Sequence, residues 1–436
     1  MGRLIAVVTA FTLLIPAAPA AAAELTRVIS SGEPGHAFGL DLSLGWDRTQ
    51  KTATITREYA EPSTAGDPAA PFATVKELRQ LRYSETTNVL VPRLAVGLWE
   101  DLQLEFELPY YLSQETSWKL ASGVGDPTLP DTISGNMVDP SGALYASGSH
   151  GLFDVTGTQT VFHGGVAGDL KVGLRWAPFS QQRDDTKPTW VLGVQLTAPT
   201  AKLYDPAAGR GTYWQSPYVL AARSGPVGQK VWRYALFTAV SRHLGPIDPY
   251  FQAGVTVLQK SSSTYSNCDH AAALVNPGPG SDPQLRPDAV ALCAASPSRW
   301  GARLPFLSGL SFGAELLPYE DAAAHQKIAL DLRLSAEYTS SARWYNELTD
   351  ATGKLLATGA YVTVSGRVGL IFRASEHVSL QAAGSLGWVS PHDLTGEDYA
   401  SDQNPNFDWR YDAPGRRFRS AGESVFDLSV KGLLAF

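Results

Sequence analysis

Apolar and polar residues alternate over unusually long stretches of this chain. In LQLEFELPYYL, the even positions carry Leu102, Leu104, Phe106, Leu108, Tyr110 and Leu112. The odd positions include two carboxylates, Glu105 and Glu107. Successive side chains of a β-strand point to opposite faces, so a strand here has one apolar and one polar face, whereas a helix would scatter the same residues. The segment therefore predicts a strand, with either a protein core or lipid against its apolar face.

Twelve segments share this alternation, and most are ten to thirteen residues long. They are 36–58, 80–98, 102–112, 166–178, 188–198, 230–242, 249–259, 304–317, 326–338, 359–372, 378–389 and 423–436. Strands of soluble proteins average about five to six residues, whereas a tilted strand that crosses a membrane needs about nine to eleven. The lengths therefore favour strands that cross a membrane.

The connections between these segments alternate between short and long. The short ones are 99–101, 179–187, 245–248, 318–325 and 373–377, and the long polar ones include 113–165, 199–229, 260–303, 339–358 and 390–422. Short periplasmic turns and long extracellular loops are typical of outer-membrane barrels, and only a closed barrel satisfies every backbone group of a sheet in lipid. We expect an all-β fold, a transmembrane antiparallel up-and-down β-barrel of about 12 strands. A secreted soluble β-protein is the alternative.

The first residues are typical of a secretory signal peptide. Arg3 precedes an apolar stretch, 4–15, and three alanines, 21–23, form a small-residue cleavage site. No later run of about 18 apolar residues predicts a transmembrane helix. We therefore expect a signal peptide at 1–23 and a single barrel domain at 24–436, located in the outer membrane of a Gram-negative bacterium.

Charge and the final residues indicate the partners. The chain has 35 basic and 42 acidic residues, a formal net charge of −7, and no basic block that would follow a phosphate backbone. Nucleic acid is therefore not expected. The last segment, VFDLSVKGLLAF, alternates and ends on Phe436, which resembles the assembly signal of outer-membrane proteins. The expected partners are outer-membrane lipid, the barrel-assembly machinery and a small-molecule solute.

The chain contains two cysteines, Cys268 and Cys293, within a loop rich in Ser, Pro and Gly. In an oxidising compartment such a pair most simply forms a disulfide. We expect a bond that staples this extracellular loop.

Charged residues on the polar faces of the strands predict the lining of the barrel lumen. They are Asp41, Arg93, Glu105, Glu107, Asp169, Lys171, Arg175, Asp331, Arg333, Glu337, Arg367, Asp427 and Lys431. These residues form either a polar constriction that filters solutes or ion pairs that fill the interior. Because acids and bases nearly balance, we expect weak ion selectivity in both cases.

Aromatic residues near the predicted strand ends fit the interfaces of a membrane. They are Trp99, Trp176, Trp190, Trp344, Trp388 and Tyr110.

No catalytic, metal or cofactor site is expected. A barrel lipase needs a Ser and a His near the outer rim, but Ser241 and His243 lie on the lumen parity beside a periplasmic turn. His163 and His270 are interpreted as solvated loop residues. The acids of the last loop match no calcium-binding spacing and are also interpreted as solvated; they are Asp393, Glu397, Asp398, Asp402, Asp408 and Asp412.

Three stretches resemble the family of the phenol meta-pathway outer membrane protein. They are GLWEDLQLEFELPY (97–110), GDLKVGLRWAPF (168–179) and WVLGVQLTAPT (190–200), although the family has Gly where this chain has Ala201. The resemblance implies uptake of small, aromatic or apolar compounds and transfers no catalytic residue. Two functions remain open. One is a channel for passive uptake of small solutes, and the other is a plugged structural or adhesion barrel whose surface loops bind a partner.

Overall fold

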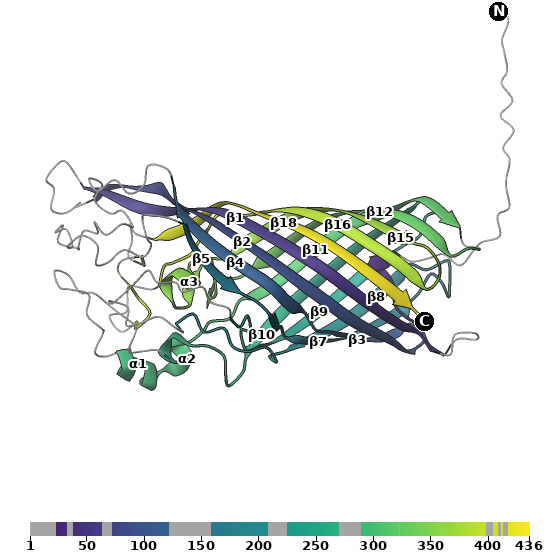
Figure 1. The fold of residues 1–436 in the computed structure, drawn as a ribbon, viewed down its shortest axis with the longest axis horizontal. Coiled ribbons are helices and arrows are strands. Elements are labelled where there is room, and N and C mark those ends of the chain that lie inside the picture. Colours follow the sequence, from purple (N-terminus) through teal and green to yellow (C-terminus); the bar gives the residue numbers. More distant parts are fainter. Residues whose placement is uncertain are drawn as a thin grey trace, which may run out of the picture.

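The computed structural model describes residues 23–32, 38–62, 72–121, 158–207, 225–269, 289–321, 323–397, 404–408, 411–412 and 417–436. Within them the chain forms a closed antiparallel barrel of 12 strands, which confirms the predicted fold class (Figure 1). Leu40, where the first strand begins, lies beside Phe436, the last residue of the chain. Their backbones exchange two hydrogen bonds, of 3.0 and 2.8 Å. The pairing of the first strand with the last closes the sheet.

The crossings follow chain order around the barrel. They are β1 (Leu40–Pro62), β2 (Phe72–Trp99), β3 with β4 (Leu102–Glu107, Tyr110–Leu120), β5 with β6 and β7 (Thr158–His163, Val166–Ala167, Leu170–Phe179), β8 (Thr189–Ala198), β9 (Val231–Ser241), β10 (Ile247–Lys260), β11 (Phe306–Asp321), β12 (Gln326–Thr339), β15 (Tyr361–Arg373), β16 (Val378–Val389) and β18 (Phe418–Ala435). All of these neighbours pair antiparallel, as an up-and-down barrel requires.

Two neighbouring crossings are interrupted at the same height, which the sequence did not predict. Pro109 has no N–H to donate and separates β3 from β4. Opposite it, Gly168 approaches so closely that an added Cβ would lie 2.9 Å from the Pro109 ring. Gly165 has a φ of +68° and separates β5 from β6. The expected strands 102–112 and 166–178 were therefore too short, because the crossings continue beyond these breaks to Leu120 and Thr158.

The first two strands extend past the other strands as a long hairpin (Figure 1). They pair with each other from Leu40 with Val96 to Pro62 with Phe72. Beyond Arg57 and Leu81 they pair only with each other, so half of their backbone groups are satisfied across the hairpin and the outer half is left for water, as a segment outside lipid allows. The hairpin therefore runs beyond the predicted ends at 58 and 80.

A continuous apolar belt surrounds the barrel. Its exposed side chains include Leu44, Phe106, Leu174, Leu236, Phe251, Phe312, Leu334, Val368, Leu380, Leu386 and Phe426, all on the predicted outward parity or its equivalent in neighbouring strands. A closed barrel can expose such a belt only to lipid, so the protein lies in the outer membrane. Trp99, Trp176 and Trp388 are also exposed. Trp344 was wrongly predicted at the interface, because it is buried inside the extracellular mouth. No helix among the described residues is long and apolar enough to cross a membrane.

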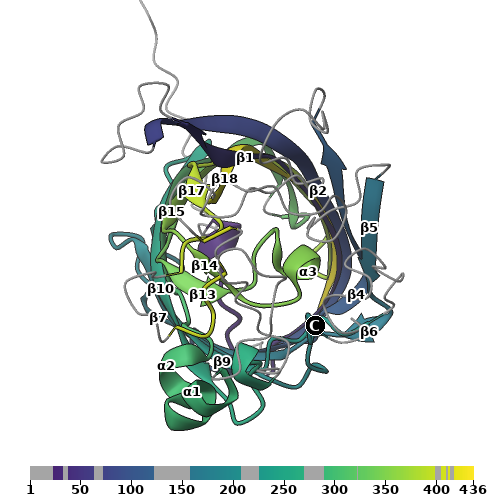
Figure 2. The same cartoon turned by 90° about the vertical axis from the view of Figure 1, so that its left-hand side faces the viewer.

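Several short elements lie inside the ring of strands or at its rim. Figure 2 shows α3 (Thr349–Thr352), β13 (Ala342–Trp344) and β14 (Leu356–Thr358) within the ring. The other short elements are η1 (Glu24–Thr26), β17 (His392–Asp393), α1 (Ala289–Ala295) and α2 (Pro297–Trp300). The predicted disulfide joins Cys268 to Cys293 beside α1 and α2. The alternation of apolar and polar residues predicted the strands of the barrel wall but not the short elements inside the barrel or at its rim.

Candidate functional site

Charged side chains of adjacent strands meet inside the barrel. The Glu105 carboxylate contacts the guanidinium groups of both Arg93 and Arg175, the latter at 3.2 Å. The Gln103 amide also donates to Glu105 at 3.2 Å. These side chains come from β2, β3 and β7, whose polar faces point inward because their apolar faces meet lipid. One buried carboxylate thus organises two cations on the lumen wall.

Other residues predicted for the lumen lie in similar networks. Lys171 pairs with Glu107 at 2.6 Å, and Arg333 pairs with Asp331 at 3.2 Å. Asp427 accepts hydrogen bonds from Thr49 and Ser385, Asp169 accepts the Ala201 N–H, and Asp41 pairs with Arg27. These contacts stiffen the wall.

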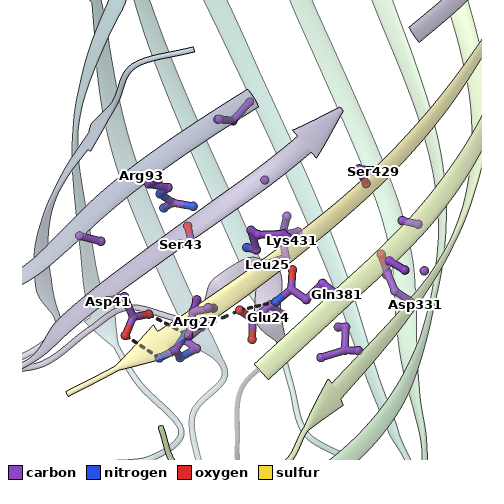
Figure 3. Close-up of a pocket in the computed structure, with 18 of the residues that line it drawn as sticks. Glu24, Leu25, Arg27, Asp41, Ser43, Arg93, Asp331, Gln381, Ser429 and Lys431 are labelled. Carbon is purple, nitrogen blue, oxygen red and sulfur yellow. Dashed lines mark hydrogen bonds and ion pairs between the residues drawn. The ribbon is translucent and has the colours of Figure 1, made fainter. Parts of the chain in front are cut away.

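Arg367 and Lys431 stand apart from these networks. Within the described part of the chain neither forms an ion pair, and the Arg367 Nε is buried without a hydrogen-bond partner. Both line an interior cavity of about 360 Å³, whose lining also includes Asp47, Arg93 and Gln381. Figure 3 shows Lys431, Arg93 and Gln381 around this cavity. A second cavity, of about 440 Å³, is lined by Glu105, Arg175 and Glu337 and reaches across β9, β10 and β11 to the outward-facing Leu236 and Leu310. The ion pairs therefore leave open space and two cations that face it.

The N-terminal segment 23–32 closes the periplasmic end of the lumen. Arg27 forms an ion pair with Asp41 at 2.9 Å, and the Gln381 amide donates to the Glu24 carboxylate at 3.0 Å (Figure 3). At the periplasmic rim, the Ser30 hydroxyl donates to Asp101 in the turn between β2 and β3 at 2.9 Å. Most of these contacts are polar, but Val28 also packs against the small apolar cluster of Ala177, Val191 and Ala239. The sequence alone gave no sign of them, because a segment before the first strand carries no alternation to interpret.

Loops fold into the extracellular mouth around an apolar core. Leu348, Ala351 and Leu356 of the loop after β12 pack with Leu394 and Tyr411 of the last loop. They contact the inner wall of the barrel through a set of side chains from the extracellular halves of the strands: Ala53, Ile55, Leu81, Tyr83, Trp118, Val161 and Phe418. The apolar residues in the otherwise polar stretch NELTDATGKLLATG were the sequence signal for this packing.

The acids of the last loop were wrongly predicted to be solvated. Glu397, Asp408 and Asp412 are buried, while Asp393 remains exposed. Glu397 forms a two-pronged ion pair with Arg343, and Arg343 holds the pKa of the Glu397 carboxyl below its usual range despite burial, which alone would raise it. Burial raises the pKa of Asp412 to about 6. Asp398 and Asp402 lie outside the described residues.

The histidine predictions have mixed outcomes. His163 is buried in β5 rather than solvated, within 3.6 Å of Asp350. His270 lies outside the described residues. Beside the periplasmic turn, His243 bonds to Asp248 at 2.6 Å, while the Ser241 hydroxyl bonds to Thr26 at 2.5 Å. Ser241 and His243 therefore bond to different partners, and His243 does not activate the Ser241 hydroxyl as a base.

One group of side chains among the described residues could hold a metal ion, although no metal site was expected. Glu347, His392 and Glu423 bring their ligand atoms within 4.8 Å of one another at the extracellular mouth.

The comparisons find solved outer-membrane barrels of similar extent but low similarity. No protein-family model and no curated protein matches the sequence. An outer membrane channel from Pseudomonas putida F1 is 13% identical, with a TM-score of 0.39, and the match covers 91% of this chain and 95% of that one. A FadL homologue of Pseudomonas aeruginosa is 12% identical, with a TM-score of 0.33, and the match covers 91% of this chain and 90% of that one. The P. putida toluene transporter TodX is 11% identical, with a TM-score of 0.30, and the match covers 91% of this chain and 90% of that one. Likeness at this level supports no inference about solute or residue roles.

Proposed function

We propose that this protein is an outer-membrane channel through which small solutes diffuse passively. The observation that carries the proposal is the charged lumen, in which two cavities lie between the N-terminal segment at the periplasmic end and the loops in the extracellular mouth. A purely structural barrel of twelve strands has no need of unpaired cations facing a cavity, because unpaired buried charge costs free energy. Solute passage gives these cations a role.

Arg367 and Lys431 favour solutes that carry a negative group. Most other charges that line this cavity lie in ion pairs, so the field there is set mainly by these two cations, by Asp47 and by Glu24, which attracts Lys431. A low-dielectric wall strengthens such a field. Elsewhere in the lumen, Asp169, Glu337 and Asp427 form no ion pair among the described residues, so the proposed channel has at most a weak preference for anions.

Aromatic solutes are the second candidate class, and one observation favours them. A row of rings stands in the mouth, with centroid distances of 4.7 Å between His163 and Tyr204, 5.2 Å between Tyr204 and Tyr345, and 5.1 Å between Tyr345 and Trp344. Offset and edge-on contacts of this kind also accommodate a small aromatic molecule. Aromatic carboxylates would match both the rings and the cations.

Single-channel current across a planar bilayer, with mature protein refolded in detergent, tests the proposal. We expect stepwise openings with slight anion preference in a salt gradient. Replacing Arg367→Gln together with Lys431→Gln should move the reversal potential toward cation preference. Arg48→Gln is the matched control, because its even position on β1 faces outward with Leu42 and Leu44. Silence from correctly folded protein would contradict the channel and favour the plugged structural or adhesion barrel.

We also propose that residues 1–23 are removed and that Phe436 acts as the assembly signal. The Glu24 backbone N–H lies 2.5 Å from the Glu315 carboxylate, where a free terminal ammonium would form an ion pair. Phe436 is exposed at the seam between β1 and β18. The mass of the purified protein should correspond to a start at Glu24, and deletion of Phe436 should lower the amount of barrel assembled in cells.

A further inference from the structure

Three buried side chains from separate segments converge at the extracellular mouth. Glu347 lies in the loop between β13 and α3, His392 in β17, and Glu423 in β18. Their ligand atoms lie within 4.8 Å of one another, and each residue is at least nine-tenths buried. A nitrogen and two carboxylate oxygens are ligands that a divalent transition metal accepts.

The imidazole of His392 is oriented by a hydrogen bond to a backbone carbonyl, as is common for histidines that bind metals. Its Nδ1 lies 3.0 Å from the Ser390 carbonyl oxygen, so Nδ1 carries the proton and donates it, which leaves the Nε2 lone pair free. The ring also stacks on Tyr361, with centroids 4.4 Å apart. A backbone carbonyl that fixes the tautomer and the ring orientation is a common outer-sphere partner of a metal ligand.

The two carboxylates are oriented but not fully satisfied. The Ser420 hydroxyl donates to the Glu423 Oε2 at 2.6 Å, which leaves Oε1 directed at the cluster. The Glu347 Oε2 is buried and has no hydrogen-bond partner. A buried acceptor without a partner costs about 1–3 kcal/mol, so a ligand for this atom would be stabilising.

Lys51 marks the position where positive charge binds. Its ammonium lies 2.8 Å from the Glu423 Oε1 and also contacts the Glu347 Oε1. One ammonium between two carboxylates leaves the cluster net negative. The Lys51 side chain is 25% exposed, so its flexible stem can carry the ammonium toward water when another cation arrives.

We propose that Glu347, His392 and Glu423 form a binding site for a divalent transition metal of the zinc class, which displaces the Lys51 ammonium. One imidazole, two carboxylates and a water complete a tetrahedral set. Calcium and magnesium prefer sites made of oxygen ligands only, with six or more of them, so they fit poorly. The bound metal would tie the loop that carries α3 and the β17 segment to the barrel wall at β18, and thereby hold the mouth loops inward.

Zinc binding by the folded full-length barrel in detergent tests this proposal independently of any channel activity. The metal content after equilibrium dialysis against micromolar zinc should approach one ion per chain. His392→Gln should weaken binding at least about tenfold. Lys51→Met should strengthen it by a similar factor, because the competing cation is gone. His377→Gln is the matched control, since His377 lies 3.3 Å from Glu376 in an exposed periplasmic turn and can bind zinc only loosely.

Two results would overturn the site. One is equal zinc binding by the wild type and His392→Gln. The other is no binding by both the wild type and Lys51→Met. Heat-modifiable migration on gels shows whether each variant is folded, and Lys51→Arg, which keeps the competing charge, should show no gain over the wild type. If Lys51→Met does not fold, zinc binding by Glu347→Gln is measured in its place. Loss of zinc binding in Glu347→Gln would support the site, and retained zinc binding in that variant would contradict the proposal.

Discussion

The two ends of the lumen are closed by different kinds of interaction. At the periplasmic end, the N-terminal segment is held by ion pairs and hydroxyl or amide contacts, such as Arg27 with Asp41 and Ser30 with Asp101. At the extracellular end, the loops share a buried apolar core that includes Leu348 and Leu356, together with a buried ion pair. One closure is mainly polar, with Val28 packed on a small apolar cluster, and the other resembles the interior of a soluble domain.

This difference indicates which closure can move. Ion pairs with exposed members contribute about 0–1 kcal/mol and weaken in salt, whereas burial of a Leu side chain contributes about 1.5–3 kcal/mol. Local opening in proteins starts where few apolar contacts hold a segment. The N-terminal segment is therefore the more easily moved element, since its apolar packing is limited to the small cluster around Val28, and the mouth loops are held more firmly. The following predictions test this contrast from the strongest contact to the weakest.

The largest effect is expected at Arg343. Its replacement by Met leaves the Glu397 carboxylate buried without its main partner, and breaking a buried pair in this way costs about 3–5 kcal/mol. The last loop should then leave the mouth far more often. Thermolysin cleavage of this loop should accelerate by roughly a hundredfold to a few thousandfold, because cleavage follows the population of the open form.

The double variant Arg343→Met with Glu397→Leu is the control for this experiment. Removal of both charges leaves no unpaired carboxylate, so much of the protection should return. If Arg343→Met were cleaved at the same rate as the wild type, the ion pair of Arg343 with Glu397 would not hold the loop. The proposed difference in strength between the two ends of the lumen would then be wrong.

The wall of the barrel was predictable from sequence, and the reason is physical. Lipid outside and water inside impose the alternation on every crossing, so one rule located twelve strands and their faces. The breaks at Pro109 and Gly168 were missed because period-two patterning continues through them. The long hairpin of β1 and β2 was underestimated because its outer part has no lipid to impose a pattern.

The contents of the barrel were less predictable. His163 and Asp412 were interpreted as solvated because both were assigned to long loops, yet both are buried. The cluster of Glu347, His392 and Glu423 has no spacing motif, since its members come from three loops and strands. Such sites depend on which loops meet, and alternation along one strand carries no information about that.

Stability of the mouth should depend on pH through Asp412. Its carboxylate accepts N–H donors from Gly396, Glu397 and Asp408, but burial raises its folded pKa to about 6. Because the folded loop binds this proton more tightly than the unfolded loop does, stability increases as the pH falls from about 7 to 4.5, by about 2 kcal/mol. The lowered pKa of Glu397 acts in the opposite direction, but only below its ordinary value of 4.5.

Hydrogen exchange measures this effect at the amide of Leu394, which donates to the Phe418 carbonyl at 2.8 Å. After division by the intrinsic rate at each pH, its protection should rise between pH 7 and 4.5 in the wild type. Asp412→Asn should give a flat profile. A fall in wild-type protection over this range would show that other groups control the mouth.

The smallest effect is expected at Arg27, in the polar closure. Arg27→Gln removes an ion pair whose arginine side chain is 29% exposed, so the N-terminal segment should lose only about 1 kcal/mol. Thermolysin cleavage within 24–32 should accelerate about fivefold, and 1 M KCl should accelerate wild-type cleavage in the same way, because salt screens the same pair. Arg48→Gln, on the outward face of β1, should change nothing. If Arg27→Gln instead opened the segment as fully as Arg343→Met opens the mouth loops, the two closures would be equal in strength. The N-terminal segment would then have no claim to be the movable one.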